Sequence, residues 1–139
     1  MIVLDTNVLS EPLKARPDER VLNWLGSLRE ASGVTSASVG ELLTGVRALP
    51  AGRRRDGLLE SIESTLSTFA GNVLPYDEPA ARAYARLQEL RRAAGRPLAV
   101  EHGMIAAICT SRRTTLATRN TADFAGLDLE LVDPWSAPH

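Results

Sequence analysis

Three acidic residues that lie far apart in this chain could together support metal-dependent chemistry. Asp5 directly follows the apolar residues 2–4. Glu41 lies early in an apolar helical pattern, and Asn120 and Asp123 come shortly after a β-rich segment. Carboxylates that meet in space repel one another, so such a cluster usually holds a hard divalent cation such as Mg²⁺ or Mn²⁺. Oxygen ligands with open water positions suit metal-assisted hydrolysis of a phosphodiester.

Each of these acids also has a purely structural explanation. Asp is a favoured N-cap, so Asp5 could cap a helix that begins at Thr6, and capping does not prevent metal ligation. Thr6 would place a hydroxyl beside that carboxylate, where it could orient a metal-bound water. Ser38 and Glu41 match a capping box, whereas the functional alternative turns Glu41 towards the same strand ends as Asp5. Asp123 could simply cap a short helical turn, and spacing alone leaves these alternatives open.

Strands that alternate with helices must position these residues. Apolar periodicity and start and stop signals predict helices in residues 17–28, 38–49, 58–69, 77–94 and around 105–109. Short β-rich segments predict strands at 2–4, 33–36, 73–74, 115–118 and 129–132. This alternation predicts a three-layer α/β/α fold with a central, mostly parallel sheet of four to five strands. Ligands in such folds bind at the carboxyl ends of the strands, where the acids are expected.

Composition and charge narrow the class of protein. A chain of 139 residues with 44% hydrophobic and 24% charged residues is typical of one globular domain, here residues 1–139. The net charge of −1 argues against binding duplex DNA through bulk electrostatics, although it leaves a local basic groove open. Cys109 is the only cysteine, which excludes an internal disulfide and a cysteine-based zinc site. No apolar run approaches the roughly 18 residues of a membrane span, so we expect a soluble cytoplasmic protein.

Arginines form short clusters along the chain. Residues 53–55 are three successive arginines before a predicted helix. A solvated basic turn is the simpler explanation, and contact with an RNA backbone is the alternative. The same two explanations apply to the pairs at 91–92 and 112–113 and to Arg96.

Several segments, in this order, resemble the motifs of PIN-domain nucleases. They are residues 2–8, 36–42, 104–107, 116–124 and 132–135, which together span essentially the whole chain. The opening through residues 10–12 most resembles the VapC-type toxins of toxin–antitoxin pairs, in particular their FitB-like subgroup.

The resemblance implies a PIN-like fold and an Mg²⁺- or Mn²⁺-dependent endoribonuclease that cleaves RNA. It also implies a cognate antitoxin that keeps the enzyme inactive and through which alone the complex contacts operator DNA. A homodimer is expected, within a heteromeric assembly of higher order. The residues that the resemblance assigns to the catalytic and metal site are Asp5, Glu41, Asn120 and Asp123, flanked by Thr6 and Arg119 as substrate-binding residues.

The third acidic position of the family departs from the pattern. The aspartate of the family lies two residues before Met104, and this chain has His102 there. His102 could be a substitution, natural or introduced, that impairs the nuclease, or a working metal ligand that favours Mn²⁺ over Mg²⁺. It could also be an ordinary, partly buried histidine. Glu101 is adjacent, but one residue along a helix turns by about 100°, so it should point elsewhere.

We predict weak or absent Mg²⁺-dependent cleavage that His102→Asp restores. The alternative to an impaired enzyme is a catalytically inert PIN-like scaffold, which binds an antitoxin in a DNA-binding autorepressor complex.

Overall fold

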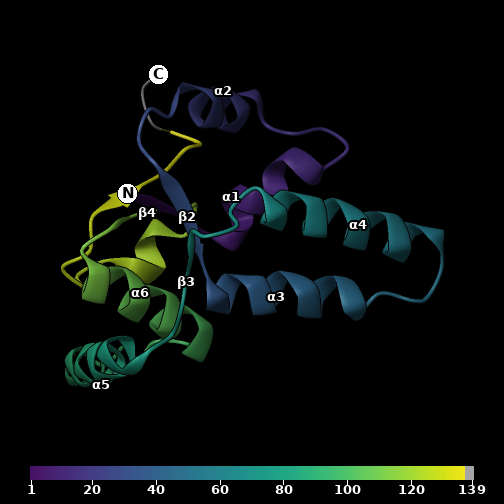
Figure 1. The fold of residues 1–139 in the computed structure, drawn as a ribbon. Helices are drawn as coiled ribbons and strands as arrows, with labels where there is room; N and C mark the ends of the chain where they lie inside the picture. The colour runs from purple at the N-terminus through teal and green to yellow at the C-terminus, as the bar shows by residue number, and fades with distance from the viewer. Residues whose placement is uncertain (137–139) are drawn as a thin grey trace.

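A five-stranded sheet forms the centre of the molecule (Figure 1). The computed structural model describes residues 1–136; residues 137–139 of the expected single domain lie outside that part. The strands are β1 (Ile2–Leu4), β2 (Ser32–Thr35), β3 (Val73–Leu74), β4 (Thr115–Ala117) and β5 (Leu131–Val132). Their order is β3-β2-β1-β4-β5 and every neighbouring pair is parallel, which confirms the predicted α/β class and sheet.

Helices cover both faces of this sheet. They are α1 (Thr6–Ser10), α2 (Glu19–Ser27), α3 (Ser36–Arg47), α4 (Arg53–Ser67), α5 (Glu78–Ala93) and α6 (Val100–Arg112). Two short 3-10 helices, η1 (Glu11–Leu13) and η2 (Thr121–Phe124), complete the described part of the chain. None of the helices in residues 1–136 is both long enough and apolar enough to cross a membrane.

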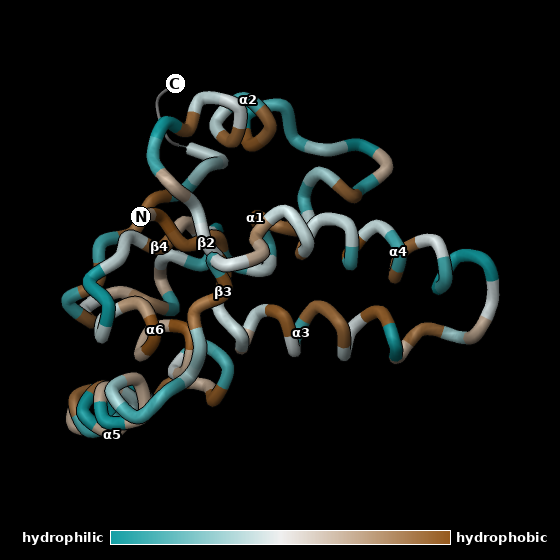
Figure 2. Tube along the Cα trace, in the orientation of Figure 1, coloured by the Kyte–Doolittle hydropathy of each residue, from teal (hydrophilic) through white to brown (hydrophobic). Residues whose placement is uncertain are grey.

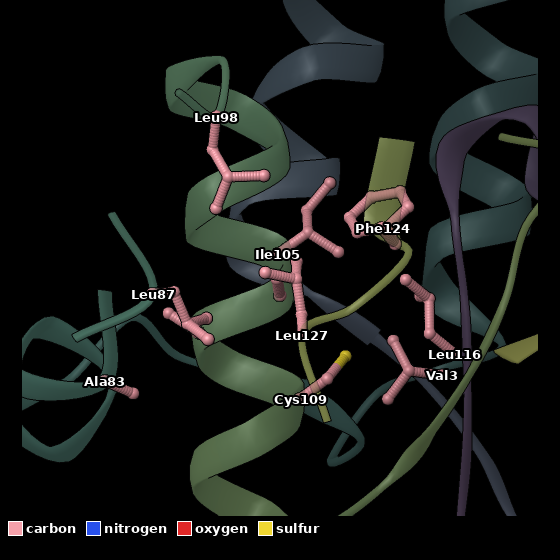
Figure 3. Close-up of a cluster of buried hydrophobic side chains, with 11 residues drawn as sticks. Val3, Ala83, Leu87, Leu98, Ile105, Cys109, Leu116, Phe124 and Leu127 are labelled. Carbon is pink, nitrogen blue, oxygen red and sulfur yellow. The ribbon is translucent and has the colours of Figure 1, made fainter. Parts of the chain in front are cut away.

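The central strand explains why there are two hydrophobic layers. Successive side chains of a strand point to opposite faces, so Val3 lies on one side of the sheet and Ile2 and Leu4 on the other. Val3 packs with residues of α5, α6 and η2, among them Phe124 (Figure 3). Ile2 and Leu4 pack against α1 and α2, where Trp24 is buried. All three residues of β1 are therefore apolar, as expected for a parallel strand covered on both faces.

Cys109 belongs to the first of these layers and is fully buried (Figure 3). Burial disfavours the thiolate and raises the pKa of the thiol to about 12. Cys109 is therefore a core thiol that stays protonated.

The predicted start of the helix that carries Glu41 is wrong. Helix α3 begins at Ser36, and Thr35 is its N-cap, because the Thr35 hydroxyl oxygen accepts a hydrogen bond from the Ser38 amide (3.0 Å). Ser38 therefore lies inside the first turn instead of capping it. Glu41 falls in the second turn, so the Ser38–Glu41 capping box does not form. The physical reason is that β2 runs directly into α3, and its last residue supplies the cap.

Helices α3 and α4 form an antiparallel hairpin that projects from the sheet (Figure 1). Helix α3 starts directly after β2, at the carboxyl ends of the strands. Residues 48–52 join the two helices at the far end of the hairpin. We call this pair of helices the α3–α4 arm.

Candidate active site at the carboxyl ends of the strands

Asp5 lies where the central strand ends, and its side chain is 2% exposed. Its Oδ1 accepts a hydrogen bond from the Thr6 amide (2.8 Å), so Asp5 is the N-cap of α1 as predicted. Its Oδ2 accepts a hydrogen bond from the Thr118 hydroxyl (2.7 Å). Within residues 1–136, Asp5 forms no ion pair. A buried carboxylate with only neutral donors keeps an uncompensated negative charge, which a bound cation would offset.

Thr118 joins the ends of the two central strands. Besides donating to Asp5, its hydroxyl oxygen accepts hydrogen bonds from the Asn120 amide (3.0 Å) and from the Asn7 side chain (3.4 Å). The side-chain oxygen of Asn7, Oδ1, accepts from the Arg119 main-chain amide (3.2 Å). Sequence reasoning did not single out Thr118 or Asn7. The predicted strand at 115–118 included Thr118, whereas β4 ends at Ala117 and Thr118 follows it directly, as Asp5 follows β1.

His102 and Asp123 face each other across α6 and η2. The His102 Nδ1 atom lies 3.9 Å from Asp123 Oδ2, and the two side chains are 28% and 55% exposed. The His102 ring also packs against Phe124, with 5.0 Å between the ring centroids. Contact between two of the predicted site residues is therefore present, and it becomes an ion pair only when His102 is protonated.

Two arginines hold the η2 turn that carries Asp123. The Arg91 guanidinium is 6% exposed and donates to the main-chain carbonyls of Asp123 and Arg96. Arg96 in turn donates to the carbonyl of Ala122 (3.3 Å). The solvated explanation is therefore wrong for Arg91. Helical spacing from Ala80, Ala83 and Leu87 places Arg91 on the buried face of α5, a signal present in the sequence.

Glu41 is exposed on α3. It lines a groove of about 540 Å³ together with Glu101 of α6. The floor of this groove is made of small residues, including Ala37 and Gly40. Glu101 and its neighbour His102 thus face different surroundings, as the 100° rotation per residue requires.

Arg119 is exposed beside Asn120, and its guanidinium stacks on an aromatic ring. The guanidinium carbon lies 5.0 Å from the centroid of Trp135, a cation–π distance. Trp135 is itself 5% exposed and belongs to the hydrophobic layer under α2. Stacking on the ring face leaves the N–H groups at the edge of the guanidinium available for a phosphate oxygen.

The acids do not converge to metal-ligand distance. In residues 1–136, no three His, Cys, Asp or Glu side chains lie close enough to hold a metal ion. Asp5 is buried at the strand ends, His102 and Asp123 are in contact, and Glu41 lies on the rim beside Glu101. The oxygen donors of Asp5, Glu41 and Asp123 suit Mg²⁺ or Mn²⁺, whereas the imidazole of His102 suits Mg²⁺ poorly.

Comparison with known proteins agrees with this architecture. A family model described as "PIN domain" matches residues 2–128. The chain is 42% identical over 137 residues to Toxin FitB of Neisseria gonorrhoeae, which covers 97% of this chain and 99% of that protein. It is 39% identical over 137 residues to VapC ribonuclease Y4jK of Sinorhizobium fredii, covering 97% and 98%. A chain in the structure of FitAB bound to an IR36 DNA fragment is 41% identical, with a TM-score of 0.93 over 100% of this chain and 99% of that one.

Proposed function

This chain belongs to the PIN-domain family, and on that premise we propose that it is a VapC-type toxin, a divalent-metal-dependent endoribonuclease neutralised by a cognate antitoxin. The observation that carries the proposal is similarity along nearly the whole chain to Toxin FitB and to VapC ribonuclease Y4jK. The buried carboxylate of Asp5 at the strand ends supports it. The whole chain, residues 1–139, acts as a single PIN domain.

The residues proposed to hold the metal are Asp5, Glu41 and Asp123, with His102 as the fourth side chain. A divalent metal held by these residues would lower the pKa of a water molecule and would offset the charge that develops on the phosphodiester. The Thr6 amide and the Thr118 hydroxyl hold the two oxygens of Asp5 in place.

Substrate contacts are assigned to residues at the ends of β1 and β4. Arg119 binds a phosphate oxygen from its position over Trp135. Thr6 supports Asp5, because its amide and its hydroxyl both donate to Asp5 Oδ1, at 2.8 and 3.4 Å, and we assign it to the edge of the substrate site. Asn120 follows Thr118, which accepts a hydrogen bond from its amide and so sets the direction of this segment.

His102 impairs this site in the chain as it stands. A neutral imidazole supplies no negative charge where the family has a carboxylate, and nitrogen is a poor ligand for Mg²⁺. We therefore propose weak cleavage with Mg²⁺ and better cleavage with Mn²⁺.

Purified protein freed from its antitoxin tests the proposed activity. Incubation with RNA in Mn²⁺ is expected to give endonucleolytic products, and Asp5→Asn is expected to abolish them, because it removes the central carboxylate. Thr68→Val, an exposed change just after α4, is the matched control and should cleave like the unchanged protein. Equal cleavage by Asp5→Asn and the unchanged chain would contradict the assignment of Asp5.

The proposed partners are inferred from the relatives. The FitAB structure holds a DNA fragment, and a chain of net charge −1 is poorly suited to bind operator DNA alone. We propose that this chain contacts operator DNA only through its antitoxin, in the cytoplasm, and that it is a homodimer within that complex.

A catalytically inert scaffold is the second candidate. The observation that favours it is that a histidine occupies the third acidic position of the family pattern. An inert scaffold binds the antitoxin and DNA but shows no divalent-metal site. Calorimetric titration of the isolated chain with millimolar Mg²⁺ and Mn²⁺ separates the two candidates, since only the enzyme is expected to bind either ion.

A further inference from the structure

Four arginines gather at the far end of the α3–α4 arm, and we call them the arginine tip. Arg47 ends α3, and Arg53, Arg54 and Arg55 form the first turn of α4. All but the half-buried Arg55 are exposed. Asp56 is the only acidic residue between positions 42 and 59. In a chain whose net charge is −1, the end of the arm therefore carries a local charge of +3.

These charges have no partner in the described structure. Within residues 1–136, none of the four forms an ion pair, as is true of every arginine there except Arg20, Arg82 and Arg112. Three of the four also lie at a helix N-terminus, the end whose partial positive charge disfavours cations. Folding of the arm therefore does not explain the arginine tip.

The arm leads from the candidate site to the arginine tip. Helix α3 begins directly after β2, which pairs with β1. Because the carboxyl ends of parallel strands lie at the same edge of the sheet, α3 starts beside the end of β1, where Asp5 lies. Glu41 and Arg47 are separated by six residues of α3, about 9 Å along its axis. The far end of the arm is hydrophilic at the start of α4 (Figure 2).

We propose that the arginine tip binds the phosphate backbone of the RNA substrate outside the position of cleavage. This inference rests on the proposed ribonuclease function. Arginine binds phosphate through two parallel N–H groups and keeps its charge at every physiological pH. Residues 42–59 contain no aromatic side chain on which a base could stack, so the contact reads charge and not sequence. The arginine tip thus favours long RNA over short RNA, whatever its sequence.

The test replaces the four arginines together by glutamine. The matched control replaces four exposed arginines elsewhere, which removes the same charge: Arg16, Arg29, Arg82 and Arg86. Binding of a fluorescent 30-nucleotide RNA is measured by anisotropy in EDTA at several salt concentrations, so that no cleavage occurs. The slope of log K against log salt is negative, and loss of three to four phosphate contacts should make it shallower by about 2 to 3. Binding at 0.1 M salt should weaken on the order of 100-fold.

Equal slopes and affinities for the tip variant and its control would overturn the proposal. It is also overturned when the tip variant loses antitoxin binding while its RNA binding is unchanged, because the arginine tip then serves an acidic protein segment. Cleavage is scored separately in Mn²⁺ with the unchanged chain. RNA binding that depends on the arginine tip, without any cleavage, would refute the proposed ribonuclease function and support RNA binding by the arginine tip. Cleavage without such binding would support the ribonuclease function and refute RNA binding by the arginine tip.

Discussion

Replacing His102 by aspartate tests the electrostatics of the candidate site most directly. His102 Nδ1 lies 3.9 Å from Asp123 Oδ2, so the change sets a second carboxylate near the first. Two negative charges about 4 Å apart repel by about 4 kcal/mol at an effective dielectric of about 20. A divalent cation at a similar distance from the new carboxylate is attracted by about 8 kcal/mol before desolvation. The cation therefore gains more than the repulsion costs.

Solvent screening reduces both the repulsion between the carboxylates and the attraction of the cation, because the side chains of His102 and Asp123 are 28% and 55% exposed. A net gain of about 1.4 to 2.8 kcal/mol remains a reasonable expectation, which corresponds to about a 10- to 100-fold increase in Mg²⁺ affinity. His102→Asp should therefore have a lower melting temperature than the unchanged chain in EDTA. In millimolar Mg²⁺ the order should reverse, and RNA cleavage should rise.

His102→Asn is the matched control, because it removes the ring without adding charge. Melting temperatures across an Mg²⁺ titration and cleavage of one RNA are measured for all three proteins. The reasoning is refuted when His102→Asp gains no more stability from Mg²⁺ than His102→Asn does. It is equally refuted when all three proteins cleave alike in Mg²⁺.

Three further changes test how the site and the fold are supported. Thr118→Val should cost about 1 to 3 kcal/mol in the free energy of unfolding measured with urea, because Oδ2 of buried Asp5 loses its donor; Thr118→Ser should restore most of it. Arg91→Met should destabilise the fold by about 2 to 3 kcal/mol and increase hydrogen exchange in residues 121–124, because two carbonyls lose a charged donor; unchanged exchange there would contradict the role of Arg91. Asp18 caps α2 and its hydrogen bonds with Arg20 lower its pKa from 3.8 to about 2. Its contribution is therefore complete above about pH 4 and is lost as the pH falls through about 2, so Asp18→Asn should be less stable at pH 7 and the difference should vanish near pH 2.

Local chemistry in the sequence determined the elements and part of the site. Residues 2–4 are apolar without alternation, which predicts a strand covered on both faces, and β1 is one. Asp5 and Asp77 are both N-caps, a role that the sequence can indicate because a cap depends only on the next three residues. The order of the motifs along the chain was enough to indicate the PIN family.

Tertiary structure decided which polar groups meet. The hydrogen bond between Thr118 and Asp5 joins residues 113 positions apart and depends on the register that pairs Leu4 with Ala117. The side chain of Arg91 reaches the η2 turn, 32 positions along the chain, only because α5 packs on α6 and α6 contacts η2.

The start of α3 shows most clearly the difference between what local sequence determines and what tertiary structure determines. Ser38 and Glu41 have the spacing of a capping box, yet Thr35 caps the helix, because the pairing of β2 with its neighbours determines where the strand ends. Propensity and capping act over a few residues and can be predicted from the sequence. Strand register and helix docking depend on the burial of apolar side chains from the whole chain, and they determine where Glu41, His102 and Asp123 lie in space.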